Sequence, residues 1–257
     1  MQFPYFDLNG KAAIITGGAT GIGRGIAEGL ADAGSGIVLA ARRLDACKAA
    51  CEEIRGRTGV KTLPLQCDVT KKADIDRLVR ETEKEFGRID ILVNNSGIGG
   101  SEKPILEMGD ADWDSVINTN LNSVFFLSRA VAGHMANRGE GGKIINVASI
   151  GGIFAVRNMS AYCASKAACL QLTKVMALEW VRHNIQVNAI LPGYFETPMN
   201  TQFFSSDTGK GIIQKKIPIK RIGQIEELRG VAVLLASTAS SFMTGSAIVV
   251  DGGQTCG

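Results

Sequence analysis

The sequence has few of the residues that usually hold metal ions. Its two histidines, His134 and His183, are isolated from each other, and its six cysteines form no C-x-x-C pair. Cys47 and Cys51 stand at helical spacing and could serve as ligands, but scattered cysteines without a histidine cluster are typical of reduced thiols in a cytoplasmic protein. We therefore expect no metal site.

Long apolar runs and strong net charge are also absent. The longest apolar runs, such as "VAVLLA", are far too short to span a membrane, and the first residues, "MQFPYFDLNGK", have neither the basic nor the apolar region of a signal peptide. A net charge of +3 is too small to indicate nucleic acid or an anionic membrane as the main partner. These absences predict a cytoplasmic protein that binds neither nucleic acid nor membranes.

Short apolar segments and glycine are what the sequence has in quantity. Glycine accounts for 31 of the 257 residues and occurs in definite clusters, which indicates tight turns and close backbone approaches. Seven segments rich in Val, Ile and Leu show little alternation, as strands do when both faces of a parallel sheet are covered. These predicted strands are 12–16, 36–41, 61–67, 90–95, 143–149, 185–191 and 247–252.

Helical segments separate the first strands. They are predicted at 23–34, 44–59 and 71–87, with Gly34 just after the end of the first and Thr70 as the N-cap of the third. This alternation predicts an α/β protein of three layers, with a doubly wound parallel sheet and right-handed crossovers.

One irregular stretch, 193–222, interrupts this pattern late in the chain. We find no linker, internal repeat or low-complexity segment, so the expectation is one domain over 1–257 in which 193–222, called the flap below, is a mobile substrate-binding segment.

A glycine-rich loop joins the first predicted strand to the first predicted helix. The segment "TGGATGIG" (16–23) has glycines at the spacing G-x-x-x-G-x-G. In this context glycines allow the backbone to approach a pyrophosphate, and the N-terminus of the new helix favours the anion. The loop therefore predicts dinucleotide binding through Gly17, Ala19, Thr20, Gly21, Ile22 and Gly23.

The end of the second predicted strand bears on the choice of dinucleotide. In this fold that position faces the adenosine ribose, where an acidic residue binds a 2′-hydroxyl and a basic residue accommodates a 2′-phosphate. Ala41 is followed by Arg42 and Arg43, and no carboxylate occurs before Asp45. The pattern favours NADP(H), with NAD(H) as the alternative if both arginines simply face solvent at the start of a helix.

Taken together with further motifs, the sequence resembles the short-chain dehydrogenase/reductase family, in its branch of roughly 250-residue chains with a Rossmann-like fold. The resemblance covers nearly the whole chain: after "TGGATGIG" come "CDVT", "NNSG", "NTNLNSVFF", "INVASIGG", "YCASK" and "LPGYFETPM". Ser96 departs from the alanine that the family usually has in its N-N-A-G motif. The resemblance implies further cofactor contacts at Asp68, Val69, Asn95, Ser96, Gly97, Tyr162, Lys166, Pro192, Gly193, Phe195 and Thr197.

The catalytic residues implied by the resemblance are Asn120, Ser149, Tyr162 and Lys166. Tyr162 and Lys166 stand four residues apart, which places them on one face of a helix. Y-x-x-x-K alone also fits a surface tyrosine beside a solvated lysine, but the surrounding motifs favour chemistry. A neighbouring ammonium favours the phenolate that a tyrosine base needs, and Ser149 can hydrogen-bond the substrate oxygen. The resemblance further implies that Lys166 holds the nicotinamide ribose and that Asn120 anchors a water beside Lys166.

The sequence thus predicts an enzyme that transfers a hydride between a nicotinamide and a secondary alcohol or ketone. The flap offers Phe195 and other apolar residues as a wall, together with Lys210, Lys215, Lys216, Lys220 and Arg221. These cations could meet the phosphates of an acyl thioester, or they could form a solvated helix face. A 3-oxoacyl-thioester reductase, a gluconate-type dehydrogenase acting on keto-sugar acids or polyols, and a reductase of small cyclic ketones all remain open.

Two other classes of function fit parts of the sequence less well. A non-catalytic dinucleotide-binding scaffold or sensor would usually have lost part of the Asn-Ser-Tyr-Lys set, which is complete here. Nucleotide-sugar epimerases or dehydratases resemble a longer branch with different glycine spacing. The apolar positions on the predicted helices 112–135 and 161–182, and the apolar C-terminal segment, predict an oligomer, for which the resemblance implies a homotetramer.

Overall fold

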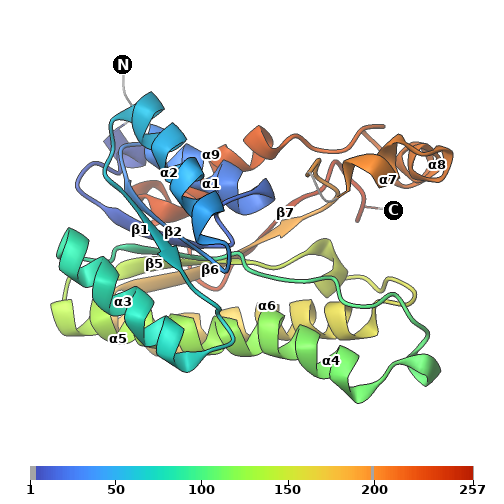
Figure 1. Cartoon of the computed structure of the whole chain (residues 1–257), viewed down its shortest axis with the longest axis horizontal. Coiled ribbons are helices and arrows are strands. Elements are labelled where there is room, and N and C mark those ends of the chain that lie inside the picture. Colours follow the sequence, from blue (N-terminus) through green and yellow to red (C-terminus); the bar gives the residue numbers. More distant parts are fainter. Residues whose placement is uncertain (1–3, 198–199, 257) are drawn as a thin grey trace.

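The computed structural model describes residues 4–197 and 200–256 and contains one seven-stranded parallel sheet (Figure 1). The strands are β1 (Ala12–Thr16), β2 (Gly36–Ala41), β3 (Thr62–Gln66), β4 (Ile91–Asn94), β5 (Gly142–Val147), β6 (Ile185–Pro192) and β7 (Ala247–Val250). Their spatial order is β3-β2-β1-β4-β5-β6-β7. Strands β2 and β3 are therefore added on one side of β1, and β4 to β7 on the other. In such sheets ligands bind beside the carboxyl ends of the strands where this change of side occurs, here between β1 and β4.

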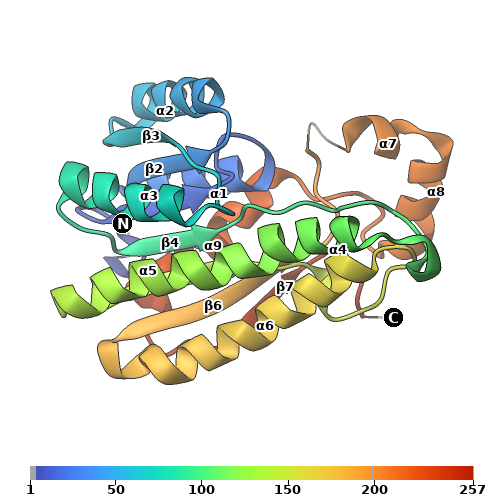
Figure 2. The same cartoon turned by 60° about the horizontal axis from the view of Figure 1, so that its bottom comes forward.

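Helices cover both faces of the sheet, as Figures 1 and 2 show. One face is covered by α1 (Gly21–Asp32), α2 (Leu44–Thr58) and α9 (Arg229–Ala236), and the other by α3 (Lys72–Phe86), α4 (Asp110–Ile117), α5 (Ser123–Arg138) and α6 (Ser160–Trp180). Successive strand residues point to opposite faces, so Ile15 and Val93 join the core below α1 while Ile14 and Leu92 join the core below α5. The predicted doubly wound three-layer α/β fold is confirmed.

Most strand ends agree with the sequence prediction, but two local predictions were wrong. Thr70 does not cap α3: Lys71 holds the N-cap position, and the Thr70 hydroxyl instead donates to the Asp68 carboxylate at 2.7 Å. The predicted helix 112–135 is divided by a π-helical turn, Asn118–Asn122, that separates α4 from α5. π-Helical turns within helices frequently occur at functional sites.

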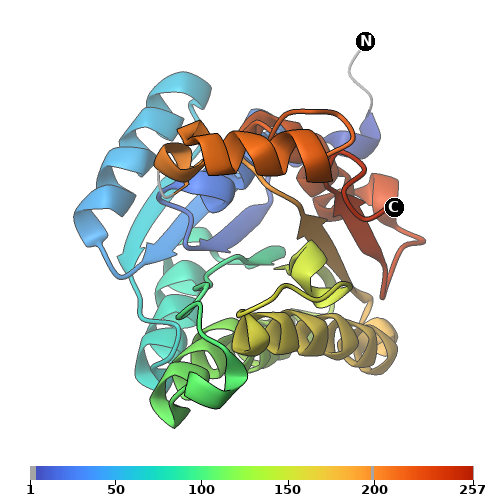
Figure 3. The ribbon, with the colours of Figure 1, turned by 90° about the vertical axis from the view of Figure 1, so that its right-hand side faces the viewer.

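The flap is largely helical, with α7 (Thr201–Ser205) and α8 (Asp207–Lys216), while its residues 198–199 lie outside the described part. Figure 3 looks toward the carboxyl ends of the strands, with α8 in orange on one side and α4 and α6 in green and yellow on the other. The flap thus lies across this end of the sheet from the N-terminus of α6. That the flap moves stays a prediction.

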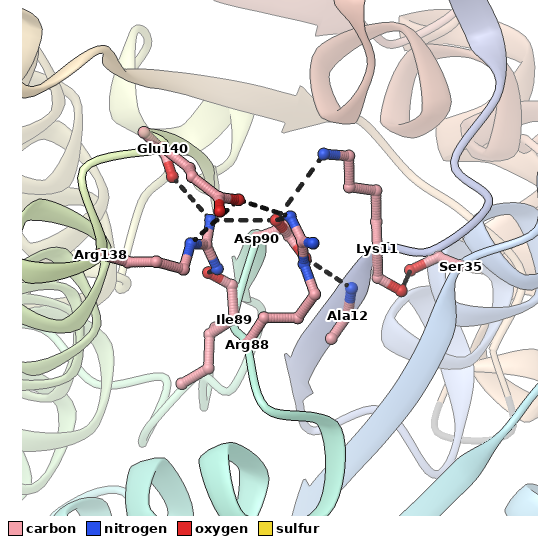
Figure 4. Close-up of polar contacts among 9 residues, drawn as sticks. Lys11, Ala12, Ser35, Arg88, Ile89, Asp90, Arg138 and Glu140 are labelled. Atoms are coloured by element: carbon pink, nitrogen blue, oxygen red, sulfur yellow. Dashed lines mark hydrogen bonds and ion pairs between the residues drawn. The ribbon is translucent and has the colours of Figure 1, made fainter.

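The amino ends of the strands are joined by a buried ion cluster around Asp90 (Figure 4). Asp90, which is 5% exposed, accepts hydrogen bonds from the backbone N–H of Ala12 at 2.9 Å, from Arg88 at 2.7 Å and from Arg138 at 3.0 Å. Burial alone would raise the pKa of Asp90, but these donors outweigh it and hold the pKa below its ordinary value. The cluster fixes the start of β1, the start of β4 and the end of α5 to one another.

No helix of the part of the chain described is long and apolar enough to cross a membrane.

Candidate active site

The glycine loop between β1 and α1 has the shape that close backbone contact requires. Gly17 and Gly21 adopt positive φ angles of 63° and 57°. A Cβ atom at Gly23 would lie 2.4 Å from the side-chain nitrogen of Asn95 and 2.5 Å from the carbonyl oxygen of Gly17, so no other residue fits there. Thr20, the N-cap of α1, makes no side-chain capping bond. The first turn of α1 therefore keeps its N–H groups for a phosphate.

Two side chains hold this loop against the end of β4. The hydroxyl of Thr16 accepts hydrogen bonds from the backbone N–H of Asn95 at 3.0 Å and of Ser96 at 3.1 Å. The Asn95 amide in turn donates to the carbonyl oxygens of Thr16 at 2.9 Å and Gly17 at 3.2 Å. The Asn95 side chain thus shapes the cradle that would hold a pyrophosphate. Sequence reasoning missed Thr16, although a polar residue ending a buried strand was a possible signal.

The predicted adenosine-binding residues lie at the ends of β2 and β3. Arg42 and Arg43 are exposed, and neither forms an ion pair within residues 4–197 and 200–256. Asp68 accepts hydrogen bonds from Thr70, which lower the pKa of this carboxyl, while the side chain of Val69 is buried. Two free guanidinium groups at the end of β2 offer an anion site where the adenosine ribose would lie.

Ser149 and Tyr162 come together around a glycine. Ser149 follows β5 in an extended conformation, and its hydroxyl accepts a hydrogen bond from the Gly151 N–H at 3.0 Å. A Cβ at Gly151 would lie 3.2 Å from the Tyr162 ring and 3.5 Å from the Ser149 hydroxyl. The two predicted catalytic hydroxyl residues therefore border the same small space.

Lys166 is buried one helical turn after Tyr162. The lysine residue is 5% exposed, and its ammonium donates to the carbonyl oxygen of Val147 at 2.9 Å. The ammonium nitrogen lies 5.7 Å from the centre of the Tyr162 ring. A surface helix with a solvated lysine is thereby excluded. The backbone carbonyl of Val147 thus holds the Lys166 ammonium on the same side of α6 as Tyr162.

Asn120 sits in the π-helical turn and uses its side chain to fix the loop after β4. Its oxygen accepts from the Ile98 N–H at 2.8 Å, and its amide donates to the Ile98 carbonyl at 2.9 Å and the Ser165 hydroxyl at 3.2 Å. A Cβ at Gly97 would lie 3.3 Å from the Asn120 oxygen and 3.5 Å from the Lys166 nitrogen, so both side chains reach Gly97. The predicted water beside Lys166 stays a prediction.

Ser165 is a second residue that sequence reasoning missed. Its hydroxyl donates to the Tyr162 carbonyl oxygen at 2.7 Å and accepts the Asn120 amide. Ser165 therefore links the π-helical turn to the first turn of α6. No motif of the sequence singled it out, because its role depends on which helices the fold brings together.

The segment after β6 completes the site. A Cβ at Gly193 would lie 2.7 Å from the Asp251 side chain, so Pro192 and Gly193 run close against the end of β7. A Cβ at Gly21 would lie 3.5 Å from the Thr197 methyl group, which places Thr197 beside the glycine loop. Thr197 would thus border a dinucleotide bound by the glycine loop.

One expectation for the flap was wrong, and one of its candidate cations is paired within the protein. The Phe195 side chain is 4% exposed and packs into the core beneath α1 and α9 instead of lining a substrate wall. Arg221 is not free, because it forms two hydrogen bonds of 2.7 Å with Glu227 and lowers the pKa of Glu227 to about 2. The predicted cationic group of the flap is therefore weaker than the sequence indicates.

Comparisons with known proteins find relatives over nearly the whole chain. The family model described as Enoyl-(Acyl carrier protein) reductase matches residues 17–255. The chain is 40% identical over 250 residues to gluconate 5-dehydrogenase of Gluconobacter oxydans, covering 97% of this chain and 96% of that one. It is 44% identical over 253 residues to 2-dehydro-3-deoxy-D-gluconate 5-dehydrogenase of Dickeya dadantii, covering 96% of each.

A solved structure is similar over nearly the whole chain. It is a gluconate 5-dehydrogenase from Burkholderia cenocepacia in complex with NADP and tartrate, 38% identical, with a TM-score of 0.93 and coverage of 99% of this chain and 98% of that one. The chain belongs to the short-chain dehydrogenase/reductase family. It is an NAD(P)-dependent oxidoreductase that acts on CH–OH and keto groups.

Proposed function

We propose that the protein interconverts a secondary alcohol and a ketone in a polyhydroxylated acid of the gluconate type, using NADP(H). The main support is that several relatives matching nearly the whole chain are named gluconate 5-dehydrogenase, 2-dehydro-3-deoxy-D-gluconate 5-dehydrogenase or 5-keto-D-gluconate 5-reductase. The engagement of Arg221 with Glu227 weakens the alternative of an acyl thioester, whose phosphates would need free cations on the flap.

In this proposal Tyr162 is the general acid and base. During oxidation its phenolate takes the proton from the substrate hydroxyl, while Ser149 donates a hydrogen bond to the same oxygen and fixes its position. The buried Lys166 ammonium lies one helical turn after Tyr162 and would hold the nicotinamide ribose. The bound nicotinamide supplies the hydride acceptor. Asn120 holds the loop after β4 against α6 by hydrogen bonds to Ile98 and Ser165.

The remaining predicted residues are proposed to bind the cofactor. The loop 17–23 and the segment Asn95–Gly97 would cradle the pyrophosphate, Asp68 and Val69 the adenine, and Arg42 and Arg43 the 2′-phosphate. Pro192, Gly193, Phe195 and Thr197 would border the nicotinamide, with Phe195 contributing through its backbone because its side chain is in the core.

Turnover of gluconate tests the substrate proposal. With NADP⁺ in excess, gluconate should give NADPH absorbance, and 5-ketogluconate with NADPH should reverse it. Acetoacetyl-coenzyme A and a cyclic ketone serve as comparison substrates under the same conditions. A kcat/KM for the thioester above that for the keto-sugar acid would overturn the proposal.

We also propose a homotetramer. Exposed apolar side chains occur on the helical layer, with Leu178 79% exposed on α6 and Phe125 and Phe126 about two-fifths exposed on α5, and again near the outer strand β7, with Phe242 fully exposed. Two such surfaces, each pairing with its copy, build a tetramer of two-fold symmetry. Sedimentation should give four times the mass of the chain, and Leu178→Glu should reduce it. A wild-type monomer would contradict this.

A cytoplasmic location is proposed on the state of the cysteines. The part of the chain described holds six free cysteines and no disulfide, as expected in a reducing compartment.

A further inference from the structure

Two asparagines lie side by side inside the sheet, close to the carboxyl ends of β4 and β5. Asn94 of β4 and Asn146 of β5 are register partners, and they are 4% and 0% exposed. The Asn94 amide donates a hydrogen bond to the side-chain oxygen of Asn146 and another to the hydroxyl of Ser128 on α5, each at 2.8 Å. Neither asparagine has a part in the chemistry described above.

These hydrogen bonds continue from β5 to α6. The Asn146 amide donates to the hydroxyl of Thr173 at 2.8 Å, and that hydroxyl donates to the carbonyl oxygen of Cys169, also at 2.8 Å. Thr173 is only 1% exposed, so water does not compete for these bonds. Because the single proton of the hydroxyl is used within α6, Thr173 serves Asn146 as an acceptor. A side chain of β5 is thus bonded directly to α6.

The next residue of β5 is bonded to Lys166. Val147 follows Asn146, and its carbonyl oxygen accepts a hydrogen bond from the Lys166 ammonium at 2.9 Å. Thr173 lies about two helical turns after Lys166, so both side chains leave α6 on the same face. Consecutive residues of β5 therefore hold α6 at two points, one of which is the lysine of the candidate active site.

A displacement of α6 along β5 would change the candidate active site. Tyr162 and Lys166 belong to α6, whereas Ser149 follows β5. The turn after Ser149 lies directly against the helix, because a Cβ at Gly152 would lie 2.9 Å from the backbone carbonyl group of Lys166. The position of α6 along the strand therefore sets how the Tyr162 ring stands relative to the Ser149 hydroxyl.

Hydrogen bonds fix such a position better than apolar contacts do. Met176 and Ala177 of α6 belong to the apolar core on this face of the sheet, and apolar contacts have no preferred direction. A hydrogen bond holds only over a narrow range of distances and angles. Apolar side chains of the same shape could replace Asn146 and Thr173 at little cost in stability. Two buried polar side chains at this place therefore indicate a requirement for position.

We propose that Asn146 and Thr173 are positioning residues for the candidate active site. Their hydrogen bond fixes α6 along β5 and thereby sets where Tyr162 and Lys166 stand relative to Ser149. The inference rests on the proposed roles of these three residues and adds the pair that keeps them in place. Because both members of the pair are buried, they act through α6 and not by contact with substrate or cofactor.

Thr173→Val tests the proposal, because valine keeps the shape of threonine and removes only the hydroxyl. We expect kcat for gluconate oxidation to fall roughly 10-fold and the Kd for NADPH to rise about threefold or more, since a displacement of about 1 Å can cost 10²-fold in rate. Thr173→Ser keeps the hydroxyl and should recover most of both losses. Asn146→Leu removes the other partner and should repeat both losses.

Thr82→Val is the matched control. Thr82 of α3 is 0% exposed, and its hydroxyl donates to the carbonyl oxygen of Leu78 at 2.7 Å, the same bond within a helix that Thr173 makes. Thermal unfolding should show a similar loss of stability in both valine variants, while kcat and the NADPH Kd change only in Thr173→Val. Equal losses of activity in the two variants would overturn the inference, as would no loss in Thr173→Val.

A double-variant cycle shows whether Thr173 acts through Lys166. In a Lys166→Ala background, Thr173→Val should change the NADPH Kd by less than about 1.5-fold, because the group that it positions is gone. An undiminished effect in that background would overturn the inference. These titrations need no substrate, so they decide on the inference even where gluconate is not oxidised, a result that contradicts only the proposed function.

Discussion

Tyr162→Phe should lower kcat by at least about 10³-fold and leave the Kd for NADPH within about twofold, because general acid–base catalysis contributes 10²–10⁴-fold and the phenylalanine ring keeps the packing. The ring borders Gly151 and the Lys166 ammonium, and only the hydroxyl is lost. Stopped-flow turnover would measure the first quantity and NADPH fluorescence titration the second. The expected loss of activity therefore follows from the missing hydroxyl and needs no change in the fold.

Tyr5→Phe provides the matched control for this substitution. Tyr5 is 61% exposed and lies in the short helix Pro4–Phe6, which packs against Thr238–Ser240, so the loss of its hydroxyl should leave both quantities unchanged. A Tyr162→Phe enzyme with more than a tenth of wild-type activity would show that another group moves the proton. Loss of NADPH binding together with activity would instead indicate a structural role for the hydroxyl.

Replacing Arg42 and Arg43 together by alanine should weaken NADPH binding roughly 30- to 100-fold and change NADH binding by less than about threefold. Because both guanidinium groups are exposed to water, the two together are expected to contribute about 2–3 kcal/mol, and only NADPH carries the 2′-phosphate. Both guanidinium groups are exposed at the end of β2, so their removal should not disturb the core. Titration of both cofactors against the wild-type and double variant measures the change in preference.

Arg80→Ala is the control for the loss of positive charge. Arg80 lies on α3, its side chain is 65% exposed, and among residues 4–197 and 200–256 it pairs only with its neighbour Glu81, so its loss should affect both cofactors alike and weakly. Wild-type protein that binds NADH as tightly as NADPH would refute the assignment of Arg42 and Arg43. An equal loss for both cofactors in the double variant would show that the arginines contact the shared part of the dinucleotide.

The sheet could be predicted from the sequence because burial on both faces produces continuous apolar segments. All seven predicted strands start within one residue of the observed start, while β5 and β7 each end two residues earlier than predicted, at Val147 and Val250. The N-cap of α3 and the π-helical turn at 118–122 could not be predicted, since each depends on the hydrogen-bond partner that the fold gives to a polar side chain. The Thr70 hydroxyl donates a hydrogen bond to Asp68, and the Asn120 oxygen accepts one from the Ile98 N–H.

The candidate site was predictable where a motif carries its own chemistry. Tyr162 and Lys166 both lie on α6, so their spacing in the sequence fixes their relative position in the structure. The glycine loop likewise connects two consecutive elements, β1 and α1. Thr16 and Ser165 were missed because their partners, Asn95 and Asn120, are distant in the sequence. Phe195 was misplaced for a related reason: its contacts with the core come from α1 and α9.

The Asp90 cluster lies at the amino ends of the strands, whereas the proposed chemistry is at their carboxyl ends. Each parallel strand therefore has one end that anchors the fold and another that presents functional groups. Variation at the anchoring rim would change how long the enzyme survives heat or acid while leaving its turnover intact. Variation at the carboxyl ends of the strands would change which substrates are used with little loss of stability. Stability and specificity can therefore evolve separately in this chain.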